Sequence, residues 1–71
     1  MLRGGVLKSF DDKRNFGFIL PDGGGSDVFV YGGSFEKAGI VPKKGQRLAY
    51  ELYTLPDRRV KAVQLRAEPA L

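Results

Sequence analysis

Residues 16–19 are apolar on both sides of a predicted strand. Successive side chains of a strand point to opposite faces, so Phe16 and Phe18 share one face, while Gly17 and Ile19 share the other. One face is therefore aromatic and the other is aliphatic or bare. This pattern predicts a strand whose two faces both avoid charge.

A second segment, residues 28–31, repeats the arrangement. Phe29 and Tyr31 point to one side, and Val28 and Val30 point to the other. A domain of this size buries only about 60% of the surface of its unfolded chain, so it covers only one of these faces. We hypothesise that the aliphatic side forms the core and that the aromatic side is a working surface. The alternative is that the rings form the core and another chain covers the valines.

Turn residues divide the chain into five predicted strands, over residues 5–11, 15–20, 26–31, 46–54 and 59–65, followed by a tail over 66–71. At most one short helical turn is expected near residues 34–38, with Ser34 as its N-cap and Gly39 as its C-terminal stop. No long segment has helical periodicity. The pattern therefore predicts one all-β domain over residues 1–71, a small five-stranded antiparallel barrel.

Three details are expected within this frame. Gly4 and Gly5 are interpreted as a flexible entry to the first strand. Phe35 is expected to pack against one end of the barrel, because large rings are more often buried than exposed, and the alternative is that it supplies a displaced stacking ring. Pro56 suits the second position of a turn over residues 55–58.

Composition narrows the classes of function. The 71 residues carry 12 Lys and Arg against 8 Asp and Glu, a net charge of +4, which favours an anionic partner such as nucleic acid. The chain has no Cys and no His, which excludes disulfides and thiolate zinc sites and removes the commonest general base. We expect no cofactor and no metal. No apolar run approaches the roughly 18 residues of a membrane span, and no signal peptide is visible, so a cytoplasmic location and no membrane partner are expected.

Rings bordered by cations suit single-stranded nucleic acid. A base stacked on an aromatic side chain contributes about 1–3 kcal/mol, and Lys and Arg add a salt-dependent attraction to phosphates. The rings and cations of the predicted strands give a candidate binding set: Phe16, Phe18, Phe29 and Tyr31, with Lys8, Lys13 and Arg14 before them and Arg58, Arg59 and Lys61 from the last hairpin. The predicted partner is single-stranded RNA or DNA.

The same residues carry a family resemblance. Residues 14–19 resemble the first ribonucleoprotein motif and residues 28–31 the second, but RNA-recognition motif domains need two helices that this chain lacks. The order of elements instead resembles the bacterial cold-shock domain, from Gly5 to about Leu65. That resemblance rests on the following short stretches: Gly17-Phe18-Ile19, Pro21-Asp22, Asp27-Val28-Phe29-Val30, Gly39 and Gly45-Gln46.

The resemblance implies an OB-type barrel that binds single-stranded RNA and DNA with low sequence preference, as an RNA chaperone or cold-shock-type regulator. Five positions match those that bind nucleic acid in the family: Lys8, Phe10, Phe16, Phe18 and Phe29. Tyr31 stands where the family usually has His, and its ring can still stack.

The sequence departs from the family at three places. Ser9 stands where the family usually has an exposed Trp, so one stacking ring is missing. Asn15 stands where Gly is usual, and we expect it to adopt a left-handed backbone, which Asn tolerates. Residues 32–35 replace a stretch that carries an additional aromatic in many relatives. We therefore expect weaker and more salt-dependent binding than in a typical relative.

Two other functions compete with this prediction. One is a protein-interaction or self-association module, in which the aromatic side forms a dimer or strands are exchanged and nucleic-acid binding is weakened; a monomer is expected, with a dimer as the alternative. The other is an enzyme, which is not expected. Near the motifs only Asp11, Asp12 and Asp27 offer catalytic groups, and adjacent carboxylates in a turn point apart.

Overall fold

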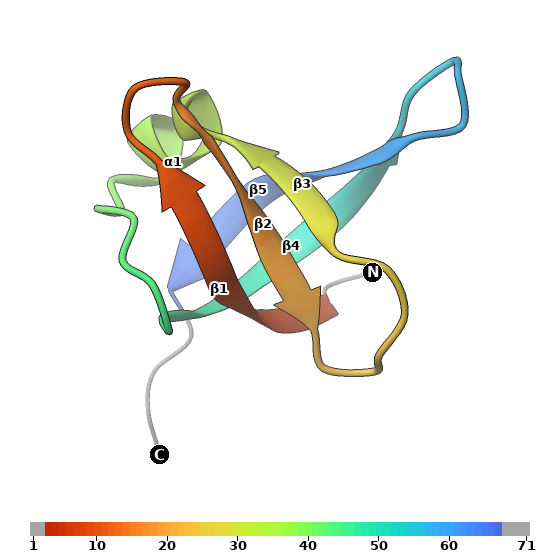
Figure 1. The fold of residues 1–71 in the computed structure, drawn as a ribbon, viewed down its shortest axis with the longest axis horizontal. Coiled ribbons are helices and arrows are strands. Elements are labelled where there is room, and N and C mark those ends of the chain that lie inside the picture. Colours follow the sequence, from red (N-terminus) through yellow and green to blue (C-terminus); the bar gives the residue numbers. More distant parts are fainter. Residues whose placement is uncertain (1–2, 68–71) are drawn as a thin grey trace.

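Five strands and one helix make up residues 3–67, which are the residues that the computed structural model describes (Figure 1). They are β1 (Arg3–Asp11), β2 (Phe16–Pro21), β3 (Val28–Tyr31), α1 (Gly32–Ala38), β4 (Arg47–Thr54) and β5 (Val60–Ala67). The strands close a barrel in the order β1-β2-β3-β5-β4. The predicted five-stranded OB-type barrel with one short helix is confirmed. Its pairs are antiparallel except at the seam between β3 and β5, which is parallel and registers Phe29 with Lys61.

The interior of the barrel takes the aliphatic side of the two apolar segments. Ile19 and Val30 are fully buried and Val28 is nearly so. On the opposite side, the rings that follow them in alternation are half-buried, and Tyr31 is 48% exposed. The hypothesis that the aliphatic side forms the core and the rings face solvent is confirmed.

Strands β1 and β2 approach each other closely at two glycines. A Cβ atom on Gly17 would lie 2.2 Å from the carbonyl oxygen of Ser9, and one on Gly5 would lie 2.6 Å from Cγ2 of Ile19. Gly5 is buried inside β1, which begins at Arg3. The prediction of a flexible entry at Gly4 and Gly5 is therefore wrong, because a residue without a side chain is what this contact requires.

A bulge in β1 sets the direction of its last residues. The register shifts between Leu7 and Ser9, so that Ser9 pairs with Phe18 and Phe10 pairs with Gly17. Leu7 and Phe10 therefore both turn towards the interior although they are three residues apart. Ser9 is left exposed on the side of the rings.

The turn from β1 to β2 confirms the expected backbone at Asn15. Asn15 has a φ of 60°, and its backbone N–H donates to the carbonyl oxygen of Asp11 at 2.7 Å. The carboxylate of Asp11 accepts the backbone N–H groups of Lys13 and Arg14 at 2.9 and 3.2 Å. This local network holds the turn that brings Phe16 into β2.

Helix α1 closes one end of the barrel. Phe35 is 1% exposed and its ring lies 5.5 Å from that of Phe10, edge to face, so its predicted packing role is confirmed. The helix begins at Gly32, directly after β3, and its N-cap is Tyr31, with no capping side chain. The prediction of Ser34 as N-cap is wrong because no loop separates strand from helix. Gly39 ends the helix with a φ of 71°, as expected.

Strand β5 is longer than predicted. Arg66 pairs with Ala49 and Ala67 pairs with Leu48, so a tail that starts at residue 66 is wrong. The register shifts opposite Tyr50, where Gln64 adopts a φ of 53° and lets β5 resume its pairing. Residues 68–71 of the predicted tail lie outside the described residues. At the other strand boundaries the structure differs by one or two residues, as at β3, which begins at Val28.

The largest buried side chain, Tyr50, is fully enclosed by the core. Within the described part of the chain its hydroxyl has no hydrogen-bond partner. Burial raises the pKa of Tyr50 above its usual value of 10.0, since the charged form loses its contact with water.

We expect the Gly17→Ala variant to lose about 1–3 kcal/mol of unfolding free energy, because the new methyl group overlaps the backbone of β1 and cannot move aside. Gly23→Ala is the matched control: nothing lies within 4 Å of its Cβ position and its φ is not left-handed, so its stability should stay within about 0.5 kcal/mol of wild type. Urea denaturation measures both. Equal stability of the two variants would contradict the close approach.

Tyr50→Phe is expected to raise the unfolding free energy by about 1 kcal/mol, because it removes a buried hydroxyl that lacks a partner. A group whose folded pKa is raised contributes its stability below the unfolded pKa and loses it as pH rises through the folded pKa. The wild type should therefore lose stability above pH 10, and this part of the loss should be absent in the variant. Denaturation at neutral and alkaline pH tests both expectations, and a variant less stable than wild type would refute them.

Candidate nucleic-acid interface

The register between β2 and β3 assembles four rings on the outer side of the barrel. Phe16 pairs with Tyr31 and Phe18 pairs with Phe29. Phe29 lies at the centre of the group, with its ring centroid 5.1 Å from that of Phe16, 5.7 Å from that of Phe18 and 4.6 Å from that of Tyr31. We call Phe16, Phe18, Phe29 and Tyr31 the aromatic face.

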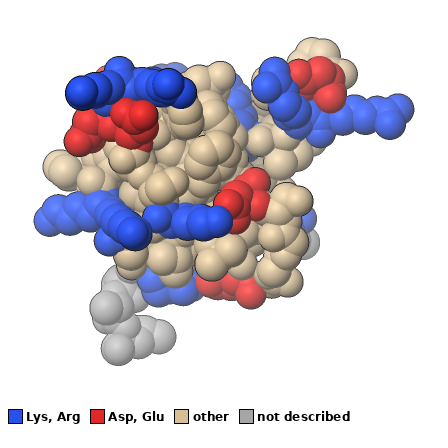
Figure 2. Space-filling view, viewed as in Figure 1, with Lys and Arg blue, Asp and Glu red and all other residues tan. Residues whose placement is uncertain are grey.

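The loop between β4 and β5 makes a wall beside the aromatic face. Leu55, Arg59 and Val60 line, together with the four rings, a cleft of about 370 Å³. The N–H of Arg58 donates to the carbonyl oxygen of Leu55 at 3.0 Å, which closes the turn that was predicted around Pro56. Figure 2 shows an uncharged surface over the upper part of the front strands, with basic and acidic side chains together at the β1–β2 turn and at the β4–β5 loop, and a band of basic side chains that meets an acidic patch across the middle of the view.

Ser9 lies at the edge of this face. It is exposed and is paired with Phe18 across β1 and β2, so a larger side chain at this position would extend the row of rings. The bulge before Ser9 is what turns this residue outward. At this position the chain therefore has a small hydroxyl group in place of a ring that could stack on a base.

Phe10 is the ring of the candidate set that the structure does not bring to the aromatic face. It is partly buried, and its ring contacts Phe35 at the end of the barrel. Phe10 thus lies on the interior side of β1, where it covers Gly17.

Three of the six candidate cations already have carboxylate partners. The pairs are Lys8 with Asp27 at 2.9 Å, Arg14 with Asp11 at 3.9 Å and Arg59 with Asp57 at 2.7 Å. All three pairs are in contact with water, and exposed pairs contribute only about 0–1 kcal/mol. A phosphate group can therefore take the place of each carboxylate at little cost.

The turn around Asp57 keeps its carboxylate ionised. The carboxylate of Asp57 accepts hydrogen bonds from the backbone N–H of Arg59 and from its guanidinium group. These two bonds, the backbone one contributing most, hold the pKa of the Asp57 carboxyl below its usual range. Asp57 therefore stays negative at neutral pH and orients Arg59 beside the cleft.

Lys61 is the best placed of the cations. Its Nζ lies 5.3 Å from the ring centroid of Tyr31 and 5.5 Å from that of Tyr53, so it stands between a ring of the aromatic face and a ring of β4. Lys13 and Arg58, from the two turns, have no ion pair among residues 3–67.

Sequence reasoning did not assign three residues of this region: Leu55 and Val60, which line the cleft, and Tyr53. Tyr53 is 53% exposed and registers with Lys61 across β4 and β5. The signal in the sequence was an aromatic residue at the end of a predicted strand, beside the predicted basic hairpin.

Within residues 3–67 no group of three or more His, Cys, Asp or Glu side chains is arranged to hold a metal ion. Nor is any helix in that range long and apolar enough to cross a membrane.

Comparison with known proteins gives matches to a single family. The family model described as "'Cold-shock' DNA-binding domain" matches residues 3–67. The chain is 45% identical over 60 residues to the "Probable cold shock protein y4cH" of Sinorhizobium fredii, covering 83% of this chain and 84% of that protein. It is 35% identical over 66 residues to a "Cold shock-like protein CspA" of Stigmatella aurantiaca, covering 92% and 96% of the two chains.

Among solved structures, the chain resembles "drosophila Unr CSD456" with a TM-score of 0.80 at 13% sequence identity. The match covers 97% of this chain and 27% of that one, so the barrel corresponds to about a quarter of that longer chain. At this identity the likeness concerns the fold.

Proposed function

This chain belongs to the "cold-shock" DNA-binding domain family, whose members bind nucleic acid, and we propose that it binds single-stranded RNA or DNA along the aromatic face. One observation carries the proposal: four rings contact one another on the solvent side of β2 and β3, while the aliphatic side of the same strands forms the core. A contiguous apolar surface that a small domain leaves in water marks a binding site.

The proposed mechanism combines stacking with charge neutralisation. Unpaired bases stack on Phe16, Phe18, Phe29 and Tyr31, which accept any base because each base has a flat face. The backbone of the strand runs past Lys8 in β1 and past the two turns. Lys13 and Arg58 are available at the turns, and Lys8, Arg14 and Arg59 exchange a carboxylate for a phosphate. Bases inside a duplex cannot reach the rings, so the site selects single strands.

This mechanism supports a role as an RNA chaperone or cold-shock-type regulator. A strand whose bases are stacked on the protein is withheld from hairpins, and release requires only the loss of small, water-exposed contacts. We assign no catalytic step: Asp11 is occupied with the turn that holds Arg14. The monomeric state and the cytoplasmic location expected from the sequence stay predictions, and light scattering with and without an oligonucleotide measures the former.

Titration with an oligo-pyrimidine strand over a salt series tests the binding mode. We expect the logarithm of the affinity to fall linearly with that of the salt concentration, by about 0.7 per phosphate contact. Tyr31→Ala should weaken binding by about 5- to 150-fold, the equivalent of one lost stacking contact. Val41→Ala, at a 70% exposed residue outside the cleft, is the control and should bind like wild type. A salt-insensitive affinity, or equal binding by both variants, would argue against the proposal.

Ser9→Trp is expected to tighten binding by about 5- to 150-fold, because it places a ring beside Phe18 at the edge of the aromatic face. Ser26→Trp adds the same ring in the loop before β3 and serves as the control. If the two variants bind alike, the row of rings does not extend to Ser9.

A further inference from the structure

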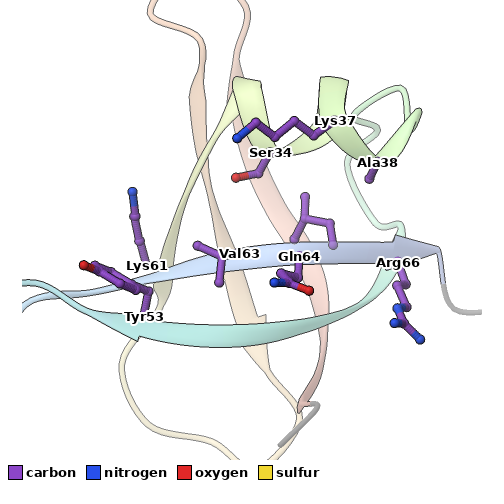
Figure 3. Close-up of a pocket in the computed structure, with 9 residues that line it drawn as sticks. Ser34, Lys37, Ala38, Tyr53, Lys61, Val63, Gln64 and Arg66 are labelled. Carbon is purple, nitrogen blue, oxygen red and sulfur yellow. The ribbon is translucent and has the colours of Figure 1, made fainter.

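A second groove runs along the side of the barrel, between α1 and β5. Its volume is about 580 Å³, larger than the cleft over the aromatic face. Ser34 and Lys37 reach it from α1, and Val63 and Gln64 line it from β5 (Figure 3). We call it the α1–β5 groove.

The groove is lined by three cations and by no carboxylate, although Glu51 pairs with Val63 across β4 and β5 and therefore lies beside it on the same side of the sheet. Lys37, Lys61 and Arg66 line it, and none of its lining residues is Asp or Glu. In the described part of the chain none of these three cations takes part in an ion pair, unlike Lys8 and Arg59 beside the aromatic face. Such a surface is complementary to a polyanion.

The groove is continuous with the aromatic face through Lys61. The ammonium group of Lys61 lies 5.3 Å from the ring centroid of Tyr31, the most exposed ring of that face, and 5.5 Å from that of Tyr53, which lines the groove. In Figure 3 the side chain of Lys37 extends from α1 over the groove and that of Lys61 rises from β5, while Arg66 marks the far end.

We propose that a single strand bound on the aromatic face continues past Tyr31 over Lys61 into the α1–β5 groove. Lys37 and Arg66 there contact its phosphates, and a base stacks on Tyr53, whose ring is 53% exposed. This extension rests on the proposed function, since the strand must first occupy the aromatic face. The extension would increase the number of nucleotides that the domain contacts. At the opposite edge of the aromatic face, Ser9 has no ring to offer.

The test compares two oligo-pyrimidine strands, one of about six nucleotides and one of about twelve, within the range of lengths that single OB barrels cover. The wild type is expected to bind the longer strand more tightly. Part of that gain is statistical, because a longer strand offers more registers. The statistical part is the same for every variant, so the ratio of the two affinities is compared between variants.

Lys37→Glu should lower the affinity for the longer strand by about 5-fold at 0.1 M salt, and should reduce its salt dependence by about one phosphate contact. The affinity for the shorter strand should be unchanged. Lys44→Glu makes the same charge change in the loop before β4, outside both the groove and the cleft, and is the matched control. Amide shifts of residues 34–38 and 63–66 should move with the longer strand only.

The outcomes separate the two proposals. If both strands bind but Lys37→Glu acts like Lys44→Glu, or if the amides of α1 do not shift with the longer strand, the groove is not part of the site and the aromatic face stands. If neither strand perturbs the aromatic face, the proposed function fails and the extension fails with it. Loss confined to Lys37→Glu and the longer strand, together with the shifts in α1, supports the continuation.

Discussion

The register between β2 and β3 is the constraint on which both the core and the site depend. Side chains alternate along a strand, so a slip of one residue would carry the rings inward and the valines outward. With Phe18 opposite Phe29, the same ladder of backbone hydrogen bonds buries Ile19 and Val30 and lifts the rings into solvent. Gly17 secures this arrangement from the other side, since its missing Cβ lets β1 approach and cover the interior.

The faces of β2 and β3 could be predicted because they follow from local alternation alone. The seam that closes the barrel could not, because the pairing of Phe29 with Lys61 joins residues from distant parts of the chain. Tyr53 was missed for the same reason: its partner Lys61 is set by the register of β4 with β5. The start of α1 and the end of β5 were misplaced where a strand runs straight into a helix, or resumes after a bulge at Gln64, since neither event has a strong local signal.

In the candidate site, too, the residue types could be predicted from the sequence, but their contacts could not. The sequence identified which cations are near the rings, but not that Lys8, Arg14 and Arg59 are each held by a carboxylate. These carboxylates orient the side chains and keep the apolar rings from being surrounded by uncompensated charge. They also mean that the net attraction for an anionic ligand comes chiefly from the cations that have no such partner. Lys61 is one of these, and it is also the one in contact with two rings.

The parallel seam between β3 and β5 has a consequence for how the domain persists in a cell. It joins β2 and β3, the two strands that carry the aromatic face, to the hairpin that carries Lys61, and it is short. A strand stacked on Phe29 and neutralised by Lys61 would bridge this seam from outside. Any ligand that binds only the folded form adds to the free energy of unfolding. Bound nucleic acid would therefore stabilise the barrel at the short pairing between β3 and β5. The lifetime of such a small domain would depend on the supply of unpaired RNA or DNA around it.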